Sequence, residues 1–437
     1  MRVLLVAVPV VLAGYALGDR GFAYLASVPG TPLFAGELIL LAGGVFVALS
    51  TGYLRVALRN SLPMVLLLVF MAWGLSKTLP LIPVYGLDSI RDAVLWYYAL
   101  MAVLVATLVV AVPGLPHQWA RAYSPFLLVL LLWSPLGTLL AGSSSPTLPG
   151  SGVTLFSHKP GNTAVAAVTA IAFLWLVPTH SWSNRARAVL TGLAVVVILA
   201  VGTQNRGALV ATLAAIVLTG FLVGRRGWNM AAVMVGTVLV GLVLGWGLNA
   251  RLPGGQGRDY SVAQLVVNVT SITQGQDSAL GGTVAFRDQL WAGAIDLESS
   301  QGALATGLGF GPNIAQDLGV SIGAADPLRS PHNSHVDILA RMGVFGAILW
   351  AAFWVSWYVL MLRRSRGGSQ LLSPELRGLV NVCMVGVMAT LINAYFDPTL
   401  ESPQVAIWLW AMAGLGLGIA ARSTLANRNA TVVGTPS

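Results

Sequence analysis

Two of the five histidines in the chain stand in one short polar segment, SPHNSH (residues 330–335), directly before a long apolar run. Serine followed by proline is a typical helix start, so we predict Ser330 as the N-cap and Pro331 as the first helical residue. His332 would then lie in the first turn, where the helix dipole disfavours a protonated imidazole. A histidine that stays neutral near pH 7 is suited to act as a general base. The alternative is an interfacial histidine without a chemical role.

His335 follows His332 by three residues, which is roughly one helical turn. At this spacing it could support His332, but we favour a structural histidine whose ring is satisfied inside the fold. Asn333, between the two, is a second candidate for a supporting role.

Three arginines on the same predicted side of the membrane are candidates for binding an anion. Arg206 opens an apolar run, where neither the positive-inside rule nor the helix dipole favours a cation, and a nearby anion would remove both costs. An arginine at the headgroup level is the alternative. Arg287 could bind a phosphate bidentately or pair with Asp288. Arg91 precedes an aromatic-rich segment; we favour a structural pair with Asp92 and keep a lipid-phosphate contact as the alternative.

Several familiar catalytic motifs are missing from the sequence. It has no Walker motif, no HExxH, no GxSxG and no Asp-x-Asp in a predicted outer loop, and its single cysteine, Cys383, lies in an apolar run. This argues against an ATPase, a zinc protease, a serine hydrolase and a metal-dependent membrane glycosyltransferase. We expect no metal and no cofactor.

The composition indicates that membrane-spanning helices position these candidate residues. Of 437 residues, 56% are hydrophobic and only 9% are charged, against about 25% charged in a soluble domain. Continuous apolar runs favour spanning helices over a β-barrel. We predict an all-α, multi-spanning protein with about twelve helices, at residues 2–18, 33–50, 62–81, 93–113, 122–141, 162–178, 187–204, 207–224, 229–249, 334–362, 376–396 and 403–421. The first run is expected to be an uncleaved helix; a signal peptide is the alternative.

The charge pattern indicates how the chain is oriented. The net charge is +9, and nearly all the arginines of the short loops fall on one side if the N-terminus is cytoplasmic. These arginines serve topology, so we expect membrane lipids and no nucleic acid as partners. We expect the protein to lie in the cell membrane. An even number of spans then puts both termini in the cytoplasm.

One long outer segment interrupts the series of spans. Residues 250–333 contain no full-length apolar run, and the segment FRDQLWAGAIDL within them predicts a short amphipathic helix with Phe286, Leu290, Ala294 and Leu297 on one face. We therefore predict a membrane domain (residues 1–249), an extracytoplasmic cap (250–333), a second membrane part (334–422) and a cytoplasmic tail (423–437).

The spacing after His332 resembles a known signature. His332-Asn333, followed after nine residues by Gly-Val-Phe-Gly (343–346), is similar to the signature of the O-antigen ligase and O-antigen polymerase superfamily. The outer-loop Arg287 and the Gly-rich turn at 307–312 also resemble that family in kind and order. About twelve spans with one large loop before the histidine is the family's layout.

A further segment agrees with the family apart from one residue. Residues 204–213, QNRGALVATL, resemble the family's Ser-Arg-Gly segment at the start of a span. Asn205 stands where family members often have serine. Arg206 itself matches the arginine of that segment.

The resemblance implies a reaction. Such enzymes move a glycan en bloc from undecaprenyl diphosphate to a sugar hydroxyl of an acceptor glycan or glycolipid, with inversion and without a metal. In this sequence His332 would deprotonate the acceptor, and Arg206 and Arg287 would neutralise the diphosphate as it leaves.

The resemblance does not separate the members of the superfamily. A ligase uses a terminal acceptor once, a polymerase uses another lipid-linked repeat, and a protein O-glycosylating enzyme shares the signature. From another class, a transporter or lipid-linked sugar flippase would place polar groups near the bilayer midplane. Here the ionisable residues gather at the outer interface.

Overall fold

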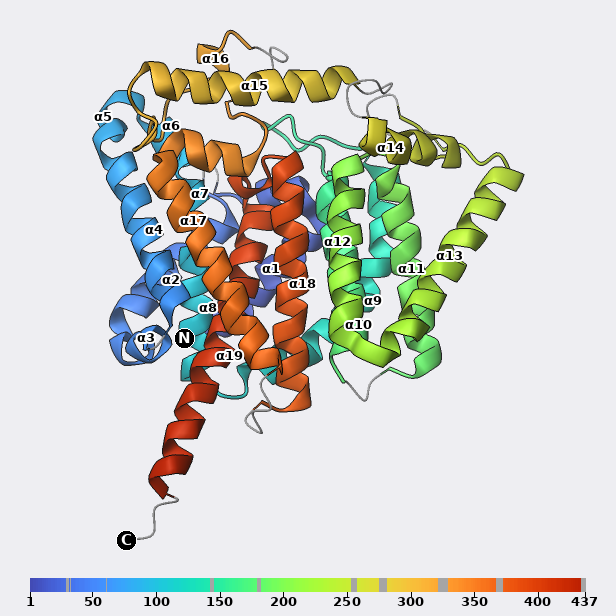
Figure 1. Ribbon diagram of the computed structural model, residues 1–437, viewed down its shortest axis with the longest axis horizontal. Helices are drawn as coiled ribbons and strands as arrows, with labels where there is room; N and C mark the ends of the chain where they lie inside the picture. The colour runs from blue at the N-terminus through green and yellow to red at the C-terminus, as the bar shows by residue number, and fades with distance from the viewer. Residues whose placement is uncertain are drawn as a thin grey trace.

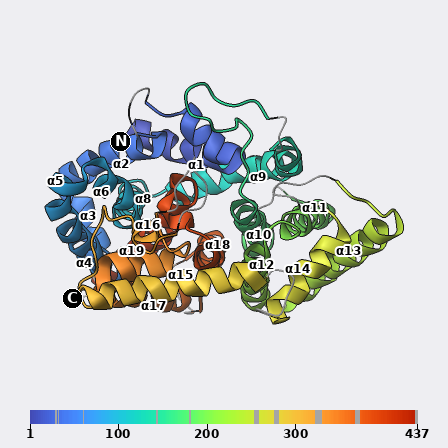
Figure 2. The same cartoon turned by 90° about the horizontal axis from the view of Figure 1, so that it is seen from above.

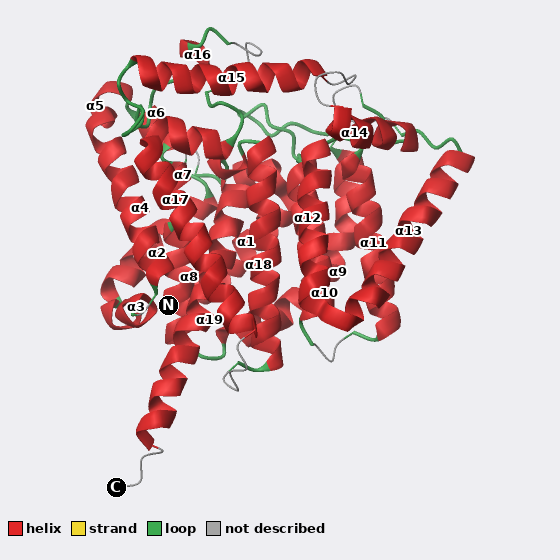
Figure 3. Cartoon of the chain, viewed as in Figure 1, coloured by secondary structure: helices red, strands yellow, loops and turns green. Residues whose placement is uncertain are grey.

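The computed structural model describes residues 1–28, 31, 33–59, 61–141, 145–178, 182–252, 258–274, 281–320, 329–366 and 372–433. These residues form helices and loops, without a strand beyond four isolated bridges (Figure 3). The first half contains α1 (Arg2–Leu25), α2 (Ala35–Leu49), α3 (Thr51–Leu58), α4 (Leu62–Thr78), α5 (Ile82–Tyr85), α6 (Leu87–Asp92), α7 (Val94–Tyr97), α8 (Leu100–Ala111), α9 (Leu115–Leu140), α10 (Pro160–Leu176) and α11 (Asn184–Gly202). The second half contains α12 (Arg206–Val223), α13 (Gly227–Gly247), α14 (Val262–Gln274), α15 (Gly281–Ser300), α16 (Ile314–Asp317), α17 (Ser334–Arg366), α18 (Pro374–Phe396) and α19 (Pro403–Val433).

The all-α membrane class is confirmed, but the count of about twelve spans is not. Nine helices among the described residues are long and apolar enough to cross a membrane, or eleven if two bent pairs are each one span. The bent pairs are α2 with α3, which meet at 90°, and the α6–α7 segment with α8, which meet at 45°. The predicted span at 162–178 is α10, an apolar helix of only 17 residues.

The helices form one bundle whose middle is the most buried part (Figure 1). In α19, 78% of the spanning window is buried, and in α18 72%, whereas α13 at the edge has 11% buried. Almost every residue of α8 is buried as well. This gradient suits a bundle in lipid, because the outer faces of edge helices can stay apolar and exposed.

Helices α14, α15 and α16 lie across one end of the bundle, and the C-terminal end of α19 projects from the other (Figure 1). Seen from above, α15 passes over the bundle from the side of α4 and α17 toward α12 and α14 (Figure 2). The predicted amphipathic helix is therefore present but longer than expected. Leu290 and Ala294 on its predicted inner face are buried at 1% and 0% exposure.

The Gly-rich segment before α16 docks by its backbone onto a break in α17. Gly343 has φ 69° and interrupts the helix, and a Cβ there would lie 2.4 Å from the carbonyl oxygen of Ala305. The break frees two carbonyls of α17, which accept from the N–H groups of Leu308 (2.8 Å) and Gly309 (2.9 Å). Only glycine combines this φ with so close an approach, which gives the first glycine of the 343–346 motif a physical reason.

A largely buried network of ion pairs, with Asp88 at its exposed edge, holds the same region together. Arg329 pairs with Asp88 and Asp92 of α6, both at 3.1 Å, and donates to the carbonyl of Gly311 at 2.9 Å. Arg341 of α17 pairs with the same Asp92 at 3.0 Å and with Asp337 at 2.9 Å. Breaking one member of such a buried network leaves an uncompensated charge, so the network fixes α6, the Gly-rich segment and α17 to one another.

Candidate active site

The loop that carries His332 does not start a helix where the sequence suggested. Helix α17 begins at Ser334, and the side chain of Asn333 accepts from the N–H groups of His335 (2.9 Å) and Val336 (3.2 Å). The prediction of Ser330 as the N-cap and Pro331 as the first helical residue is therefore wrong. His332 has φ 58°, a left-handed conformation that cannot belong to the helix, so the helix starts only after it. Asparagine caps a helix as well as serine does.

His332 is held in this strained conformation from two sides. A non-glycine residue in the left-handed region costs about 1–3 kcal/mol unless its surroundings impose it. The indole N–H of Trp291 on α15 donates to the carbonyl of Pro331 at 2.9 Å. On the other side, the backbone N–H of Leu400 donates to Ser334 Oγ at 3.2 Å. Such strain, imposed by two neighbouring elements, is typical of functional sites.

The surroundings keep the imidazole of His332 neutral. Burial lowers its pKa; the Asp397 carboxylate opposes this, and the charges of Arg287 and Lys159 add to it. The ring nitrogen Nδ1 is buried and has no hydrogen-bond partner among the described residues. The ring thus has the state of a base, with a carboxylate near enough to stabilise the imidazolium once a proton is accepted.

Arg287 is a partly buried residue of α15. Burial lowers the pKa of Arg287, Asp397 opposes this shift, and the like charges of Arg206 and Arg258 add to it. Its Nε is buried without a hydrogen-bond partner among the described residues. The structure thus brings Arg287 into the electrostatic neighbourhood of both His332 and Arg206, although the three come from separate segments.

Arg206 is the first residue of α12, and Asn205 is its N-cap. The Asn205 side chain accepts from the N–H of Ala208 at 3.1 Å. Serine would make the same kind of cap, so the one departure from the family's Ser-Arg-Gly segment keeps the local structure. Gly207 packs so closely on Phe396 that a Cβ there would lie 2.5 Å from it.

Asp397 is a site residue that we did not predict. It follows the last residue of α18, pairs with Lys159 at 2.9 Å, and acts electrostatically on both His332 and Arg287. In the sequence its signal is a carboxylate followed by proline at the end of the predicted span 376–396. Because it is far from residues 203–346 along the chain, no local pattern ties it to them.

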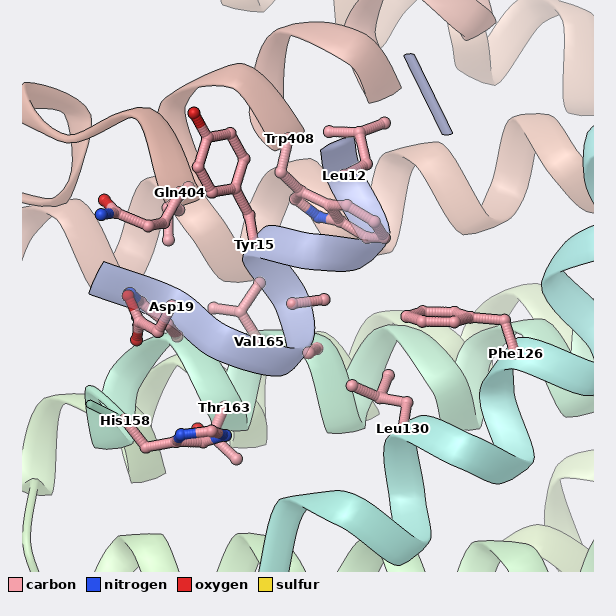
Figure 4. Close-up of a pocket in the computed structure, with 14 residues that line it drawn as sticks. Leu12, Tyr15, Asp19, Phe126, Leu130, His158, Thr163, Val165, Gln404 and Trp408 are labelled. Carbon is pink, nitrogen blue, oxygen red and sulfur yellow. Dashed lines mark hydrogen bonds between the residues drawn. The ribbon is translucent and has the colours of Figure 1, made fainter. Parts of the chain in front are cut away.

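Lys159 connects this region to a small, mostly apolar cavity that has a few polar residues on its wall. Its backbone N–H donates to Asp19 at 2.8 Å, and Asp19 also accepts from the Asn162 side chain. A cavity of about 40 Å³ lies beside Asp19, with His158 and Thr163 near the carboxylate and Phe126 further along (Figure 4). Burial lowers the pKa of His158 to about 4, so this second histidine is neutral.

The structure places the other two candidates outside the group around His332. Both ring nitrogens of His335 are engaged: Nε2 donates to the carbonyl of Leu391 at 2.9 Å, and Nδ1 accepts from the Trp350 indole at 3.1 Å. His335 thus ties α17 to α18. Arg91 is exposed on α6, and it is its neighbour Asp92 that enters the ion-pair network.

The described part of the chain contains no cluster of three or more His, Cys, Asp or Glu side chains that could hold a metal ion. The cations that gather around His332 are instead arginines and a lysine. Guanidinium groups bind phosphate oxygens bidentately, so this arrangement can receive a phosphorylated substrate beside a neutral base.

Comparison with known proteins agrees with this description. A family model described as O-antigen ligase matches residues 191–351, which run from α11 through the cap and into α17. No curated protein matches the chain. The matched part contains Arg206, Arg287 and His332, and it confirms the resemblance to the O-antigen ligase/polymerase superfamily found in the sequence.

Proposed function

We propose that this protein is a membrane glycosyltransferase of the O-antigen ligase type, which moves a glycan en bloc from undecaprenyl diphosphate to a sugar hydroxyl of an acceptor. The observation that carries the proposal is the electrostatic neighbourhood that Arg287 of α15 shares with His332 and with Arg206. A base next to a cluster of cations suits an acceptor hydroxyl next to a diphosphate. The site works at the outer face of the cell membrane, on the side of α15.

In the proposed reaction His332 takes the proton of the acceptor hydroxyl as its oxygen bonds to the anomeric carbon of the donor sugar. The bond between that carbon and the phosphate oxygen breaks, and its electron pair stays on the diphosphate. Arg206 and Arg287 stabilise the charge that develops there. Attack from the face opposite the leaving group inverts the anomeric centre, and a diphosphate leaves without a general acid.

Asp397 and the cations near His332 have opposite effects on the base. Arg287 and Lys159 favour the neutral imidazole before reaction, and Asp397 favours the imidazolium that forms during it. Asn333 supports the position of His332, because it caps α17 directly after this residue.

The experiment is complementation of a strain that lacks the gene, with surface glycans separated on a gel. Wild type restores attached glycan, and we expect His332→Asn, Arg206→Gln and Arg287→Gln not to. Asparagine at position 332 is chosen because it tolerates the left-handed backbone. If all three variants restored glycan like wild type, the proposed site would be wrong.

The same strain separates ligase from polymerase. Long lipid-linked chains that accumulate without the gene indicate a ligase, and single lipid-linked repeats indicate a polymerase. We favour the ligase because the family model that matches is described as O-antigen ligase. If neither intermediate accumulated, the result would point to a transporter or flippase.

A further inference from the structure

A third arginine, Arg258, stands beside Arg206 at the α11–α12 turn. Its side chain donates through Nη1 to the carbonyl of Gln204 at 2.5 Å, and the Gln204 side chain donates back to the carbonyl of Arg258 at 3.3 Å. Gln204 is two residues before Arg206. This reciprocal pair of bonds ties the segment at 258 to the turn that carries Arg206.

The segment around Arg258 is fixed to this turn at a second point. Asn268 of α14 is fully buried, and its side-chain amide donates to the carbonyls of Gly202 (2.8 Å) and Thr203 (2.7 Å). The cap therefore brings Arg258 to the start of α12 by two sets of hydrogen bonds on consecutive carbonyls. This is more than a surface arginine needs, so the position of Arg258 is built into the fold.

Three guanidinium groups from separate segments share one region. Arg258 and Arg206 act electrostatically on each other, and both act on Arg287. Like charges brought together destabilise one another, and the fold nevertheless holds them there with the hydrogen bonds of Gln204 and Asn268. A ligand with several negative charges, such as a diphosphate, offsets that repulsion.

The charges around His332 give the three arginines an order. The groups that act on His332 are Asp397, Arg287 and Lys159, whereas Arg206 and Arg258 act on Arg287. Arg287 is thus the arginine that acts both on the base and on the side of the Arg206–Arg258 pair. In the proposed reaction the acceptor hydroxyl at His332 attacks the sugar, so the phosphate joined to the sugar lies nearer to His332 than the phosphate joined to the lipid.

We propose that Arg258 is a further substrate-binding residue, which together with Arg206 holds the lipid-bound phosphate of the donor while Arg287 holds the sugar-bound phosphate. This inference rests on the proposed function and assigns its arginines to separate phosphates. The two roles differ chemically. Charge develops on the sugar-bound phosphate as the glycosidic bond breaks, and the lipid-bound phosphate keeps its charge throughout.

The assignment has kinetic consequences. An interaction that is equal in the ground state and the transition state changes KM and leaves kcat, whereas one that strengthens in the transition state changes kcat. Loss of Arg258 should therefore raise the KM for the donor roughly 10-fold to 100-fold, the range for one hydrogen bond to a charged group. Loss of Arg287 should mainly lower kcat.

The test uses the full-length protein in lipid nanodiscs and undecaprenyl monophosphate as an inhibitor, because this probe carries only the lipid-bound phosphate. We expect Arg258→Gln to weaken its inhibition by the same factor as it raises KM, and Arg287→Gln to leave its inhibition unchanged. Arg258→Lys keeps the charge and should lie between wild type and Arg258→Gln. Arg251→Gln, an exposed arginine of the same cap, is the matched control and should match wild type.

Two results would overturn the assignment. One is a wild-type KM and wild-type inhibition in Arg258→Gln; the other is a lower kcat at unchanged KM. If Arg258→Gln lost all activity, inhibitor binding by Arg258→Lys would decide, and binding equal to wild type would contradict the proposal. A wild-type protein that transfers no glycan would instead refute the proposed function itself, so the two failures are distinguishable.

Discussion

At the scale of single residues, His332 combines a strained backbone with a neutral ring. Its φ of 58° is imposed by the contacts of Pro331 and Ser334 with neighbouring elements. Burial lowers its pKa, and Asp397 partly restores it. A base of this kind loses activity only when the pH falls through its lowered pKa, because protonation then removes its lone pair.

The pH dependence of transfer follows from the lowered pKa of His332. We expect the acid limb of the kcat profile to lie below the ordinary pKa of histidine, with full activity at neutral pH. Asp397→Asn removes the charge that favours the imidazolium, so it should move the acid limb to still lower pH. An acid limb that did not move, or that moved to higher pH, would contradict the role of Asp397.

Asp397→Asn should also slow the reaction. A charge pair near a protein surface is worth on the order of 1 kcal/mol or more, and each 1.36 kcal/mol of barrier is a factor of ten, so kcat should fall about tenfold. Steady-state transfer at neutral pH measures this. Asp296→Asn on the exposed face of α15 is the control and should leave kcat unchanged.

The residues of the site were predictable to different degrees. Arg206 stood out because topology and the helix dipole give no reason for a cation there, His332 because it lies in a polar segment before an apolar run, and Arg287 because it lies on an amphipathic segment of the outer loop. The start of α17 was misplaced by a few residues, because the Ser-Pro signal is local and the backbone of His332 is set by tertiary contacts with Trp291 and Leu400. Asp397 could not be found, because its neighbourhood to His332 exists only after α18 packs.

At the scale of elements, the break in α17 at Gly343 joins the cap to the bundle. We expect Gly343→Ala to prevent this docking, because the new Cβ meets the backbone of Ala305 and the residue must keep a positive φ. The cost should be several kcal/mol, since overpacking costs about 1–3 kcal/mol and the backbone strain adds about 1–3 more. Thermal unfolding in detergent and the transfer assay measure it.

A matched glycine controls for this substitution. Gly236 lies in α13, and a Cβ there would meet no atom within 4 Å. Gly236→Ala should be neutral or slightly stabilising, because alanine is the better helix former by about 1 kcal/mol. Equal stability of Gly343→Ala and Gly236→Ala would show that the cap does not depend on this contact.

The positions of the helices in the sequence were easier to predict than their directions in space. Each predicted span has a helix at its position, because a long apolar run leaves the backbone few alternatives in lipid. The bends were missed: α2 and α3 meet at 90° inside one continuous stretch of sequence. Apolar character does not encode direction, which is set by packing against α8 and α19.

At the scale of the whole molecule, the cap and the basic loops lie at opposite ends of the bundle. Helix α17 runs from Ser334 below α15 to Arg366 at the far end (Figure 1). From the positive-inside rule we therefore expect α15 to lie outside the cytoplasm. We expect Asp296→Cys, exposed on α15, to react with a membrane-impermeant maleimide in intact cells.

Cysteine at a position on the opposite side provides the comparison. Arg55→Cys, exposed on α3, should react only after the cells are lysed, and the buried Cys383 should give little background. The reverse pattern would place the cap in the cytoplasm. It would then separate the candidate site from an extracytoplasmic acceptor.

The most direct test of the account is transfer by the purified protein in liposomes, with undecaprenyl diphosphate release measured for wild type and His332→Asn. We predict that wild type releases undecaprenyl diphosphate in step with glycan attachment. His332→Asn should bind the donor as wild type does. It should release undecaprenyl diphosphate about 100-fold to 10,000-fold more slowly, because this is the usual contribution of a general base. Release by His332→Asn at the wild-type rate would contradict the assignment of His332 as the base.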